Sequence, residues 1–215
     1  PIQTQEISES AGGVELKGAI AWDADLSGPR PGVIVVHEWW GCNDYARRRA
    51  VRLAELVYTG FAVDMYGDGK TAANPDEAGA LMNGLLEDLG VVRARFDAAL
   101  ETLREHSSTD ADHCAAIGYC MGGGIVLHMA RYGADLDAVA SFHGALPLAV
   151  AAPGEGAEMT ARIAVYHGEL DEFIDAEAVS AFQDEMRNNA ADCLFVMIPG
   201  ATHGFTNPIA TENGR

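Results

Sequence analysis

Short hydrophobic runs recur along the chain and alternate with longer amphipathic segments. The clearest run is residues 32–37, Gly-Val-Ile-Val-Val-His, whose consecutive β-branched side chains are typical of a strand covered on both faces. We therefore expect a central strand there. Residues 3–9 and 14–22 flank the turn Ala11-Gly12-Gly13 and predict a β-hairpin at the edge of the sheet. Further strands are predicted at 61–65, 114–117, 138–142, 163–167 and 193–198.

Apolar positions at helical spacing predict helices between these strands. Asn43 is expected to cap the first helix and Asp175 the last one. The sequence Asn74-Pro75-Asp76-Glu77 is a typical helix start, and Gly84 and Gly90 indicate that the region after it breaks into two helices. The predicted apolar stripes are Ala46, Ala50, Leu53, Ala54 and Val57 in the first helix, Val92, Phe96, Ala99, Leu100 and Leu103 in the third, and Ala178, Val179, Phe182 and Met186 in the last.

Strands that alternate with helices predict a mostly parallel central sheet with right-handed crossovers and helices on both faces. This is a three-layer α/β architecture, preceded here by the N-terminal hairpin. The length of 215 residues, of which 48% are hydrophobic, suits a single domain over residues 1–215. In such a fold ligands bind at the carboxyl ends of the strands, so candidate chemistry is expected there.

The net charge narrows the range of partners. A formal charge of −18 would repel nucleic acid and anionic membrane surfaces, so we expect a small-molecule partner, no nucleic acid and no membrane. No apolar run approaches ~18 residues and no charged-then-apolar leader opens the sequence, so neither a membrane span nor a signal peptide is expected. The four cysteines include no Cys-x-x-Cys pair, which argues against a disulfide-stapled secreted domain and a zinc site. We expect a cytoplasmic monomer or small homo-oligomer.

Cys120 lies in the glycine-rich stretch Ile117-Gly118-Tyr119-Cys120-Met121-Gly122-Gly123-Gly124. This G-x-C-x-G pattern predicts a strand, a sharp turn with Cys120 at its apex, and a helix. Gly118 and Gly122 leave room where strand and helix pass each other, and the turn forces Cys120 into a strained backbone conformation. The helix N-terminus would stabilise a thiolate and a neighbouring oxyanion. The alternative is a buried structural cysteine before a glycine-rich turn.

Two further strand ends carry potential partners for Cys120. The turn at 168–171 follows one strand and His203 follows the last, and the order nucleophile, acid, base is that of the α/β hydrolases. His203 is therefore the candidate base, whereas His143 and His167, which also end strands, are interpreted as structural residues. Composition does not determine the acid, and four carboxylates on one loop compete for the role: Glu169, Asp171, Glu172 and Asp175.

With these residues in place, the sequence resembles the dienelactone hydrolase family, α/β hydrolases that use a cysteine nucleophile. The resemblance spans most of the chain and implies an α/β-hydrolase fold. It also implies that Cys120 is the nucleophile, His203 the general base and acid, Asp171 the residue that orients His203, and Glu38 a second carboxylate beside the thiol. The motifs that carry it, in family order, are His37-Glu38-Trp39-Trp40-Gly41, Asp64-Met65-Tyr66-Gly67, Gly118-Tyr119-Cys120-Met121-Gly122-Gly123, His167-Gly168-x-x-Asp171 and His203-Gly204-Phe205.

The resemblance also implies how the thiol is controlled. An ordinary thiol is only a few per cent thiolate at neutral pH, so an imidazole, a helix N-terminus or both must activate it. Glu38 would act in the opposite direction, because an anion beside the thiol favours the neutral S–H group; in the family, substrate binding disturbs this contact and releases the thiolate. The N–H groups of Met121 and Trp39 match the family's two oxyanion donors, and Trp40 is a candidate pocket residue.

The sequence departs from the family where the substrate is recognised. Family members hold a substrate carboxylate with two arginines, but residues 67–85 offer only Lys70 and residues 204–209 contain no cation. Lys70 is kept as a candidate substrate contact, although a lysine cannot reproduce a bidentate arginine. The run Arg47-Arg48-Arg49 is interpreted as a solvated helix face. The family's C-terminal helix is expected to be truncated or absent, because the chain ends in a polar, glycine-containing tail.

The function implied by the resemblance is carboxylic ester or lactone hydrolysis. An acyl-enzyme would form on Cys120 and be hydrolysed by water that His203 activates, without a metal or an organic cofactor. The alternative is a non-catalytic or redox-responsive member of the fold, in which Cys120 is an oxidisable sensor. Asp171 and His203 favour catalysis, because a sensor needs neither of them.

Overall fold

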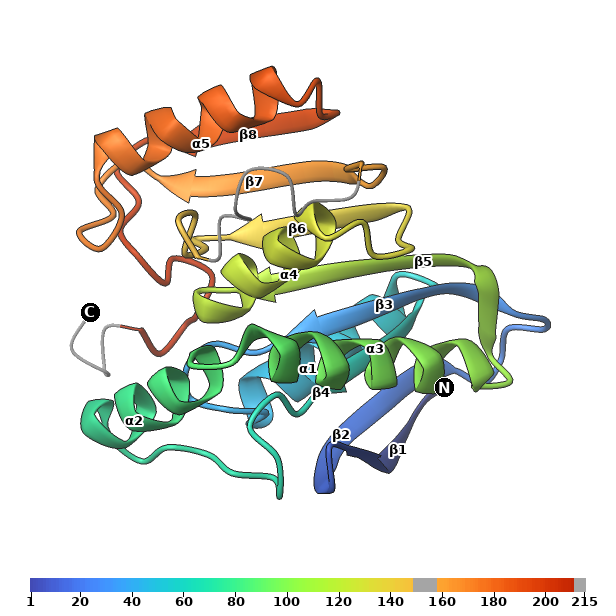
Figure 1. Ribbon diagram of the computed structural model, residues 1–215. Coiled ribbons are helices and arrows are strands. Elements are labelled where there is room, and N and C mark those ends of the chain that lie inside the picture. Colours follow the sequence, from blue (N-terminus) through green and yellow to red (C-terminus); the bar gives the residue numbers. More distant parts are fainter. Residues whose placement is uncertain (149–157, 211–215) are drawn as a thin grey trace. The chain divides into compact units, whose positions relative to one another are not determined.

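The structure, a computed structural model, describes residues 1–148 and 158–210 (Figure 1). Two units make up the chain, Pro1–Ala116 and Ile117–Arg215, and strand β5 (Thr109–Tyr119) runs from the first into the second. The loop expected over residues 147–158 and the end of the C-terminal tail lie almost entirely outside the described residues.

The first unit contains the predicted hairpin and the predicted central strand. Strands β1 and β2 pair antiparallel across a turn in which Gly12 and Gly13 have positive φ angles of 61° and 79°. The strand order is β1-β2-β4-β3-β5, so β1 is the edge strand and β3 is internal. Strand β4 pairs antiparallel with β2 and parallel with β3. The strands are β1 (Ile2–Ala11), β2 (Val14–Asp23), β3 (Arg30–Val36) and β4 (Thr59–Val63).

The helices of the first unit begin where the sequence predicts. Asn43 caps α1, and its side-chain oxygen accepts the backbone N–H groups of Tyr45 and Ala46. Asn74 caps α2 in the same way, with Pro75 at the first helical position. The helices are α1 (Asp44–Glu55), α2 (Pro75–Leu86) and α3 (Leu89–Glu105).

Helix α1 ends earlier than predicted, and the assignment of Val57 to its apolar stripe is wrong. The N–H groups of Val57 and Tyr58 donate to the carbonyl groups of Ala54 and Leu53, a Schellman pattern that closes the helix. This pattern requires a left-handed residue, and Val57 adopts a φ of 69°. Its side chain is 57% exposed instead of packing on the sheet.

The prediction of two helices after Asn74 is confirmed. The break lies at Glu87 and Asp88, between the two glycines that indicated it. Asp88 caps α3 by accepting the N–H group of Gly90. The apolar stripe predicted for α3 is buried: Val92, Phe96, Ala99, Leu100 and Leu103.

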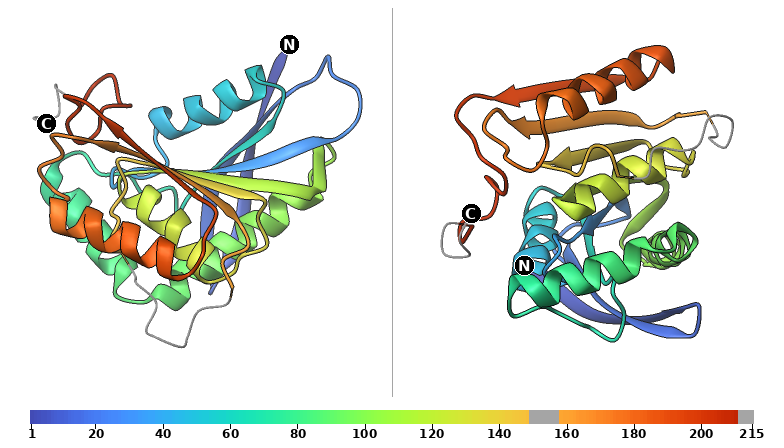
Figure 2. Two further views of the ribbon diagram at one scale, coloured as in Figure 1. Left: turned by 90° about the horizontal axis from the view of Figure 1, so that it is seen from above. Right: turned by 60° about the vertical axis from the view of Figure 1, so that its left-hand side comes forward.

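Helices cover both faces of the sheet in the first unit, as expected for a three-layer α/β fold. Helix α1 lies on one face and α3 on the other (Figure 2). The interior of β3 is accordingly apolar, and Ile34, Val35 and Val36 are completely buried. This burial explains the continuous β-branched run in the sequence.

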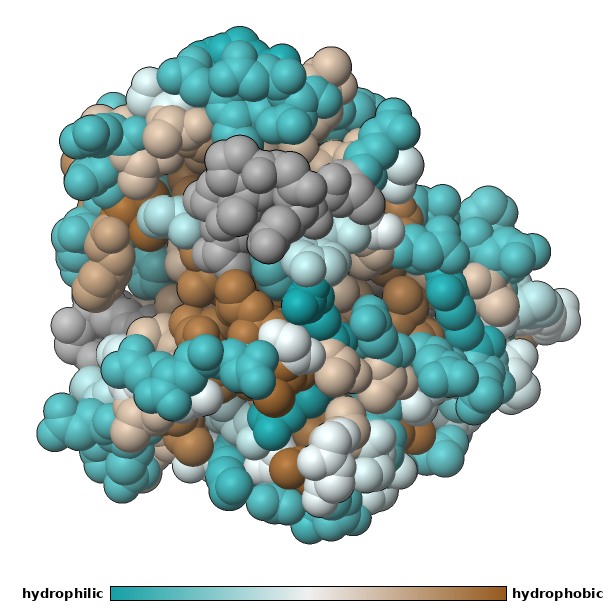
Figure 3. Space-filling model, in the orientation of Figure 1, coloured by the Kyte–Doolittle hydropathy of each residue, from teal (hydrophilic) through white to brown (hydrophobic). Residues whose placement is uncertain are grey.

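The second unit continues the sheet with parallel strands. From the last residues of β5 the order is β5-β6-β7-β8, and β6 with β7 and β7 with β8 pair in parallel. Helices α4 and α5 both lie on one face of these strands (Figure 2). Asp175 caps α5 as predicted, and the outer side of α5 is hydrophilic (Figure 3). The elements are β6 (Ala138–Phe142), β7 (Arg162–Gly168), β8 (Cys193–Ile198), α4 (Met121–Arg131) and α5 (Ala176–Asn188).

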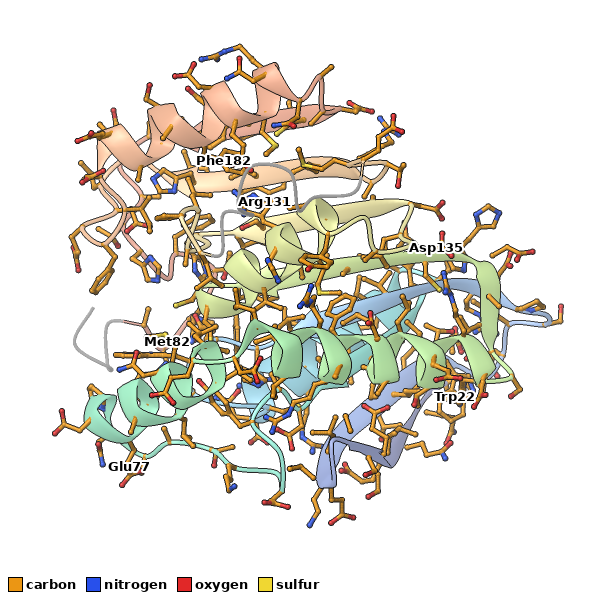
Figure 4. All side chains as sticks on the ribbon, viewed as in Figure 1. Trp22, Glu77, Met82, Arg131, Asp135 and Phe182 are labelled. Carbon is orange, nitrogen blue, oxygen red and sulfur yellow. The ribbon has the colours of Figure 1, made fainter. Side chains whose placement is uncertain are left out.

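A partly buried ion pair joins the two helices of the second unit. Arg131 on α4 donates Nε and one Nη to the two carboxylate oxygens of Glu185 on α5, at 2.6 and 2.8 Å. Its guanidinium also lies over the ring of Phe182 and donates to the carbonyl groups of Leu146 and Leu148 (Figure 4). The pair is satisfied on both sides, so it fixes α4, and with it the turn before α4, against α5.

Together the elements form an α/β fold with a mixed, mostly parallel sheet and an N-terminal antiparallel hairpin. Within residues 1–148 and 158–210, none of the helices combines the length and the apolar character that crossing a bilayer requires.

Candidate active site

Cys120 occupies the strand-to-helix turn that the sequence predicts. Strand β5 ends at Tyr119 and α4 begins at Met121, so Cys120 is the apex, with φ 54° and ψ −117°. Such a conformation costs an L-residue about 1–3 kcal/mol and is kept only where the surroundings enforce it. Gly118 is required here, because a Cβ atom at that position would lie 2.0 Å from the carbonyl oxygen of Gly122.

The turn that follows β6 holds the backbone of Cys120 from both sides. The N–H group of Cys120 donates to the carbonyl of Phe142 at 3.1 Å. The carbonyl of Cys120 accepts the N–H groups of Ala145 and Gly124, each at 3.2 Å. These bonds enforce the strained apex and fix the direction in which the sulfur points.

The structure brings Cys120, His203 and Asp171 together within the second unit. Nδ1 of His203 lies 2.8 Å from Oδ2 of Asp171, and Cys120 lies near enough to the imidazole to raise its pKa. The other carboxylate oxygen of Asp171 accepts the N–H groups of Phe173 and Ile174, so both of its oxygens are engaged. The Asp171 side chain has no exposed surface and that of His203 is 6% exposed.

The other carboxylates of this loop have different partners. Glu169 accepts the N–H group of Gly200, and Asp175 caps α5. Glu172 is exposed. Of the four competing acids, the structure therefore places Asp171 against His203.

The pKa values follow from these contacts. Burial lowers the pKa of His203, but hydrogen bonds with Asp171 and Cys120, and their charges, raise it to about 9. Burial raises the pKa of Asp171, but the hydrogen bond and positive charge of His203 outweigh it and hold this pKa below its usual value. At neutral pH the site thus favours an imidazolium that an adjacent carboxylate orients, which is the environment that stabilises a thiolate.

Two rings that were not predicted as site residues, those of Phe173 and His143, pack against His203, and Thr206 in turn contacts His143. Phe173 is 63% exposed, and its ring stands edge-on to His203 with centroids 4.9 Å apart. His143, interpreted above as structural, has its ring centroid 5.2 Å from that of His203. Nε2 of His143 lies 2.7 Å from Oγ1 of Thr206. The available signals were that Phe173 follows the acid by two residues and that His143 ends a strand.

In the first unit, side chains of His37 and Tyr66 hold the segment that begins with Glu38 through its backbone carbonyl groups. His37 Nε2 accepts the N–H group of Met65 at 3.1 Å, which leaves the ring proton on Nδ1 for the carbonyl of Glu38, 2.5 Å away. The hydroxyl of Tyr66 donates to the carbonyl of Trp39 at 2.8 Å. Burial lowers the pKa of His37, so its ring stays neutral and keeps this tautomer.

The motif Asp64-Met65-Tyr66-Gly67 supports this segment. One carboxylate oxygen of Asp64 accepts the N–H groups of Tyr66 and Gly67, and the other accepts those of Lys17 and Gly69. These four bonds fix the loop after β4, from which Tyr66 reaches Trp39. The motif thus positions the Glu38 segment through backbone contacts.

The remaining predicted residues lie as follows. Glu38 and Trp40 are buried, and the Trp40 ring stands edge-on to that of Trp39. Lys70 is half-exposed and pairs with Asp68 at 3.1 Å. The arginine run lies on α1, where Arg47 pairs with Glu6 and Arg49 donates to the hydroxyl of Tyr45. The expected contact between Glu38 and Cys120 joins the two units and stays a prediction.

An α/β sheet with a strained cysteine elbow and a buried His–Asp pair defines an α/β hydrolase. The model of the dienelactone hydrolase family matches residues 17–213, and the chain belongs to this family. It is a dienelactone hydrolase-like hydrolase.

Individual relatives agree with this assignment. The chain is 32% identical over 211 residues to protein usf of Aquifex pyrophilus, covering 94% of this chain and 87% of that protein. It is 29% identical over 208 residues to a putative carboxymethylenebutenolidase of Aquifex aeolicus, covering 94% of this chain and 87% of the relative. Among solved structures, a dienelactone hydrolase-like promiscuous phosphotriesterase from metagenomic libraries superposes with a TM-score of 0.94 at 34% identity, over 100% of this chain and 88% of that one.

Proposed function

We propose that this hydrolase cleaves carboxylic esters or lactones through an acyl-enzyme on Cys120. The observation that carries the proposal is the buried His203–Asp171 pair, with Nδ1 2.8 Å from Oδ2, beside the strained Cys120, which raises the pKa of His203. A sulfur nucleophile, an imidazole and an orienting carboxylate are the groups that acyl transfer needs.

The reaction proceeds in two halves. The Cys120 thiolate attacks the carbonyl carbon, a C–S bond forms, and the carbonyl oxygen becomes an oxyanion. When the intermediate collapses, the C–O bond breaks and the His203 imidazolium donates its proton to the departing alkoxide. Neutral His203 then takes a proton from water, the hydroxide attacks the thioester, and the C–S bond breaks to release the acid and the thiolate.

The oxyanion is stabilised by the backbone N–H groups of Met121 and Trp39. Met121 is the first residue of α4, so the positive end of the helix dipole lies at this point. Trp39 shares a peptide bond with the carbonyl of Glu38, which His37 holds. In a trans peptide the C=O and N–H groups point in opposite directions, so His37 also aims the Trp39 N–H group. One such donor contributes about 3–4 kcal/mol to the transition state.

Glu38 restrains the resting thiol in this proposal. Its carboxylate favours the neutral S–H group of Cys120, in opposition to His203 and the dipole of α4. A substrate that displaces Glu38 from the sulfur would free the thiolate only when it is needed. An idle cysteine would thus be protected from oxidation.

The substrate is expected to be neutral near the reacting carbonyl. Lys70 is paired with Asp68 in the region where the family places an arginine, and residues 204–209 carry no cation. The net charge of −18 also disfavours anionic substrates at long range. Neutral esters or lactones with small acyl groups should therefore have a higher kcat/KM than carboxylate-bearing dienelactones.

A panel of p-nitrophenyl esters and lactones, each with a carboxylate-bearing analogue, tests the proposal. Wild type should hydrolyse the neutral members and Cys120→Ala should not. Hydrolysis that survives in Cys120→Ala would assign the nucleophile to another residue. A kcat/KM for a dienelactone far above that of its neutral analogue would overturn the neutral substrate class and imply a cation from elsewhere, such as Arg47, Arg48 or Arg49.

A second candidate activity is phosphotriester hydrolysis. The relative described as a promiscuous phosphotriesterase matches the whole length of this chain at 34% identity. The Cys120 thiolate would attack phosphorus in place of carbon, form a P–S bond and break the P–O bond to the leaving group, which takes the proton of the His203 imidazolium. Neutral His203 would then activate the water that breaks the P–S bond and regenerates the thiolate. Diethyl p-nitrophenyl phosphate tests this idea: turnover should depend on Cys120 as ester turnover does. Release of p-nitrophenolate at equal rates in wild type and Cys120→Ala would contradict it.

A further inference from the structure

The turn after β6 contacts both the nucleophile and the base of the proposed site. On one side, the carbonyl of Phe142 and the N–H group of Ala145 bond the backbone of Cys120, at 3.1 and 3.2 Å. On the other side, His143, which directly follows Phe142, packs its ring against that of His203. This short turn therefore connects two catalytic groups that lie far apart in the sequence.

His143 is held in an unusual conformation to make these contacts. Its φ of 40° lies in the left-handed region, although it is not a glycine, and its side chain is completely buried. Its N–H group donates to the carbonyl of Tyr166 at 2.8 Å, which anchors the turn to the end of β7. A strained, buried, polar residue at a strand end needs a reason beyond packing, and its contacts supply one.

The ring of His143 contacts three residues of the loop that carries His203. Its Nε2 lies 2.7 Å from Oγ1 of Thr206, three residues beyond His203. The ring of Phe205 stands edge-on to that of His143 at 5.2 Å. The centroids of His143 and His203 are also 5.2 Å apart, with 66° between the planes. The loop is thus held through a hydrogen bond to Thr206 and through ring contacts with Phe205 and His203.

We propose that His143 is a positioning residue, which holds the imidazole of His203 in line between Cys120 and Asp171. The inference rests on the proposed function of these three residues. His203 must exchange protons with the sulfur and then with water without losing its bond to Asp171. A displacement of about 1 Å in such an array can reduce turnover by about 100-fold. His143 prevents that displacement through Thr206 and by its ring contact.

The hydrogen bond is isolated by matched substitutions. Thr206→Val removes the hydroxyl at nearly constant shape, Thr206→Ser keeps it, and His143→Phe keeps an aromatic ring but removes Nε2. We expect Thr206→Val and His143→Phe to lower kcat by about 10- to 100-fold with KM changed less than about threefold, since the candidate substrate contacts Trp40 and Lys70 are unchanged. The double variant should be no worse than the stronger single variant, and Thr206→Ser should stay near wild type.

Two readouts separate positioning from a general effect on folding. The first is the melting temperature of each variant. The second is the rate at which iodoacetamide alkylates Cys120 as a function of pH, which reports the coupling of Cys120 to His203 without any substrate. In Thr206→Val this rate at neutral pH should fall together with kcat. Because Thr206 is only half-buried, this variant should fold even if His143→Phe does not.

The outcomes decide the inference. Wild-type kcat and alkylation in Thr206→Val, or losses that multiply in the double variant, would overturn it. A loss of kcat that merely follows the loss of melting temperature, with unchanged alkylation, would also overturn it and leave His143 a structural residue. Failure of the proposed function looks different: wild type would hydrolyse no ester, while alkylation would still report whether Thr206 and His143 control the Cys120–His203 pair.

Discussion

His37 and His203 are both buried histidines that follow a strand, but their surroundings shift the pKa in opposite directions. His37 bonds to neutral backbone groups, the carbonyl of Glu38 and the N–H group of Met65, and burial lowers its pKa. His203 is equally buried, yet its bonds to Asp171 and Cys120 raise its pKa to about 9. The charge of the hydrogen-bond partners decides whether a buried imidazole is neutral or protonated.

His167 shows that a nearby carboxylate is not sufficient. Burial lowers the pKa of His167, and the positive charge of His203 lowers it further, although Asp171 acts in the opposite direction. The direct hydrogen bond of Asp171 goes to Nδ1 of His203. Asp171 therefore raises the pKa of one imidazole only, that of His203, whereas the pKa values of His37 and His167 are lowered and their rings stay neutral. Substitutions that remove a charged partner of His203, or His203 itself, should therefore have the largest effects.

Removing Cys120 or His203 should have the largest effect. Cys120→Ala, His203→Ala and the double variant should each lower kcat by roughly 10³- to 10⁶-fold, to similar final values, because members of such an array act as a unit. The measurement is p-nitrophenyl ester hydrolysis, with the fold of each variant checked by circular dichroism. Cys193→Ala, on β8, is the matched control and should keep its activity. Losses that multiply would argue against a shared mechanism.

Asp171→Asn removes the charge that distinguishes His203 from His37 but keeps the shape of the side chain. We expect kcat to fall by about 10²- to 10⁴-fold, since an amide cannot stabilise the imidazolium and can impose the wrong tautomer. The pKa of His203, followed by NMR titration of its ring proton, should drop from about 9. Glu172→Gln, an exposed neighbour on the same loop, should change neither quantity. Full activity in Asp171→Asn would transfer the acid role to Glu169, Glu172 or Asp175.

His203 and His37 should also affect the free energy of unfolding on opposite sides of neutral pH, His203 on the alkaline side and His37 on the acid side. The raised pKa of His203 contributes stability that is complete below its unfolded value of 6.5 and is lost as pH rises through about 9. The lowered pKa of His37 contributes stability that is present above 6.5 and is lost as pH falls. The unfolding free energy, measured in urea at several pH values, should therefore peak near neutrality.

His203→Ala isolates the alkaline limb. It should flatten the decline between about pH 6.5 and 9, a decline of up to about 3 kcal/mol in wild type, and leave the contribution of His37 to the acid limb unchanged. An equally steep alkaline decline in both proteins would mean that His203 does not carry the stabilising proton.

Much of the fold follows from the sequence because local pattern and tertiary burial agree. The continuous run over residues 32–37 predicted an internal strand, and the Asn43 and Asn74 caps predicted helix starts, because these signals act within one turn or strand. The end of α1 did not follow. Val57 continues the apolar spacing of α1, but the hydrogen bonds that close the helix hold it in a left-handed conformation. β-Branched residues rarely adopt this conformation, so the residue type does not predict it.

In the candidate site, too, the locally encoded features were predictable and those that depend on tertiary contacts were not. The elbow at Cys120 is local, so its glycines and its strained apex were predictable. The choice of Asp171 among four carboxylates depends on how one loop folds: Glu169 turns to Gly200 and Asp171 to His203. The contacts of His143 depend on a φ of 40° in a turn that meets a loop distant in sequence. The spacing of residues in the sequence does not predict this contact between two distant segments.

Glu38, which directly follows His37, gives the smallest and sharpest test. His37 holds its backbone carbonyl, whereas its carboxylate is predicted to oppose the thiolate that His203 stabilises. Glu38→Gln keeps the shape and removes the charge, so the free enzyme should hold more thiolate. Alkylation of Cys120 by iodoacetamide at neutral pH should then be faster than in wild type by up to about tenfold.

The control for this test is again Glu172→Gln, which changes the same charge on an exposed loop and should leave the rate unaltered. The increase should also appear in a His203→Ala background, from a lower starting rate, because the charge of Glu38 disfavours a thiolate whether or not His203 is present. An unchanged or slower rate in the single variant, with the fold intact, would show that Glu38 does not restrain the sulfur and that its carboxylate has a structural or substrate-binding role.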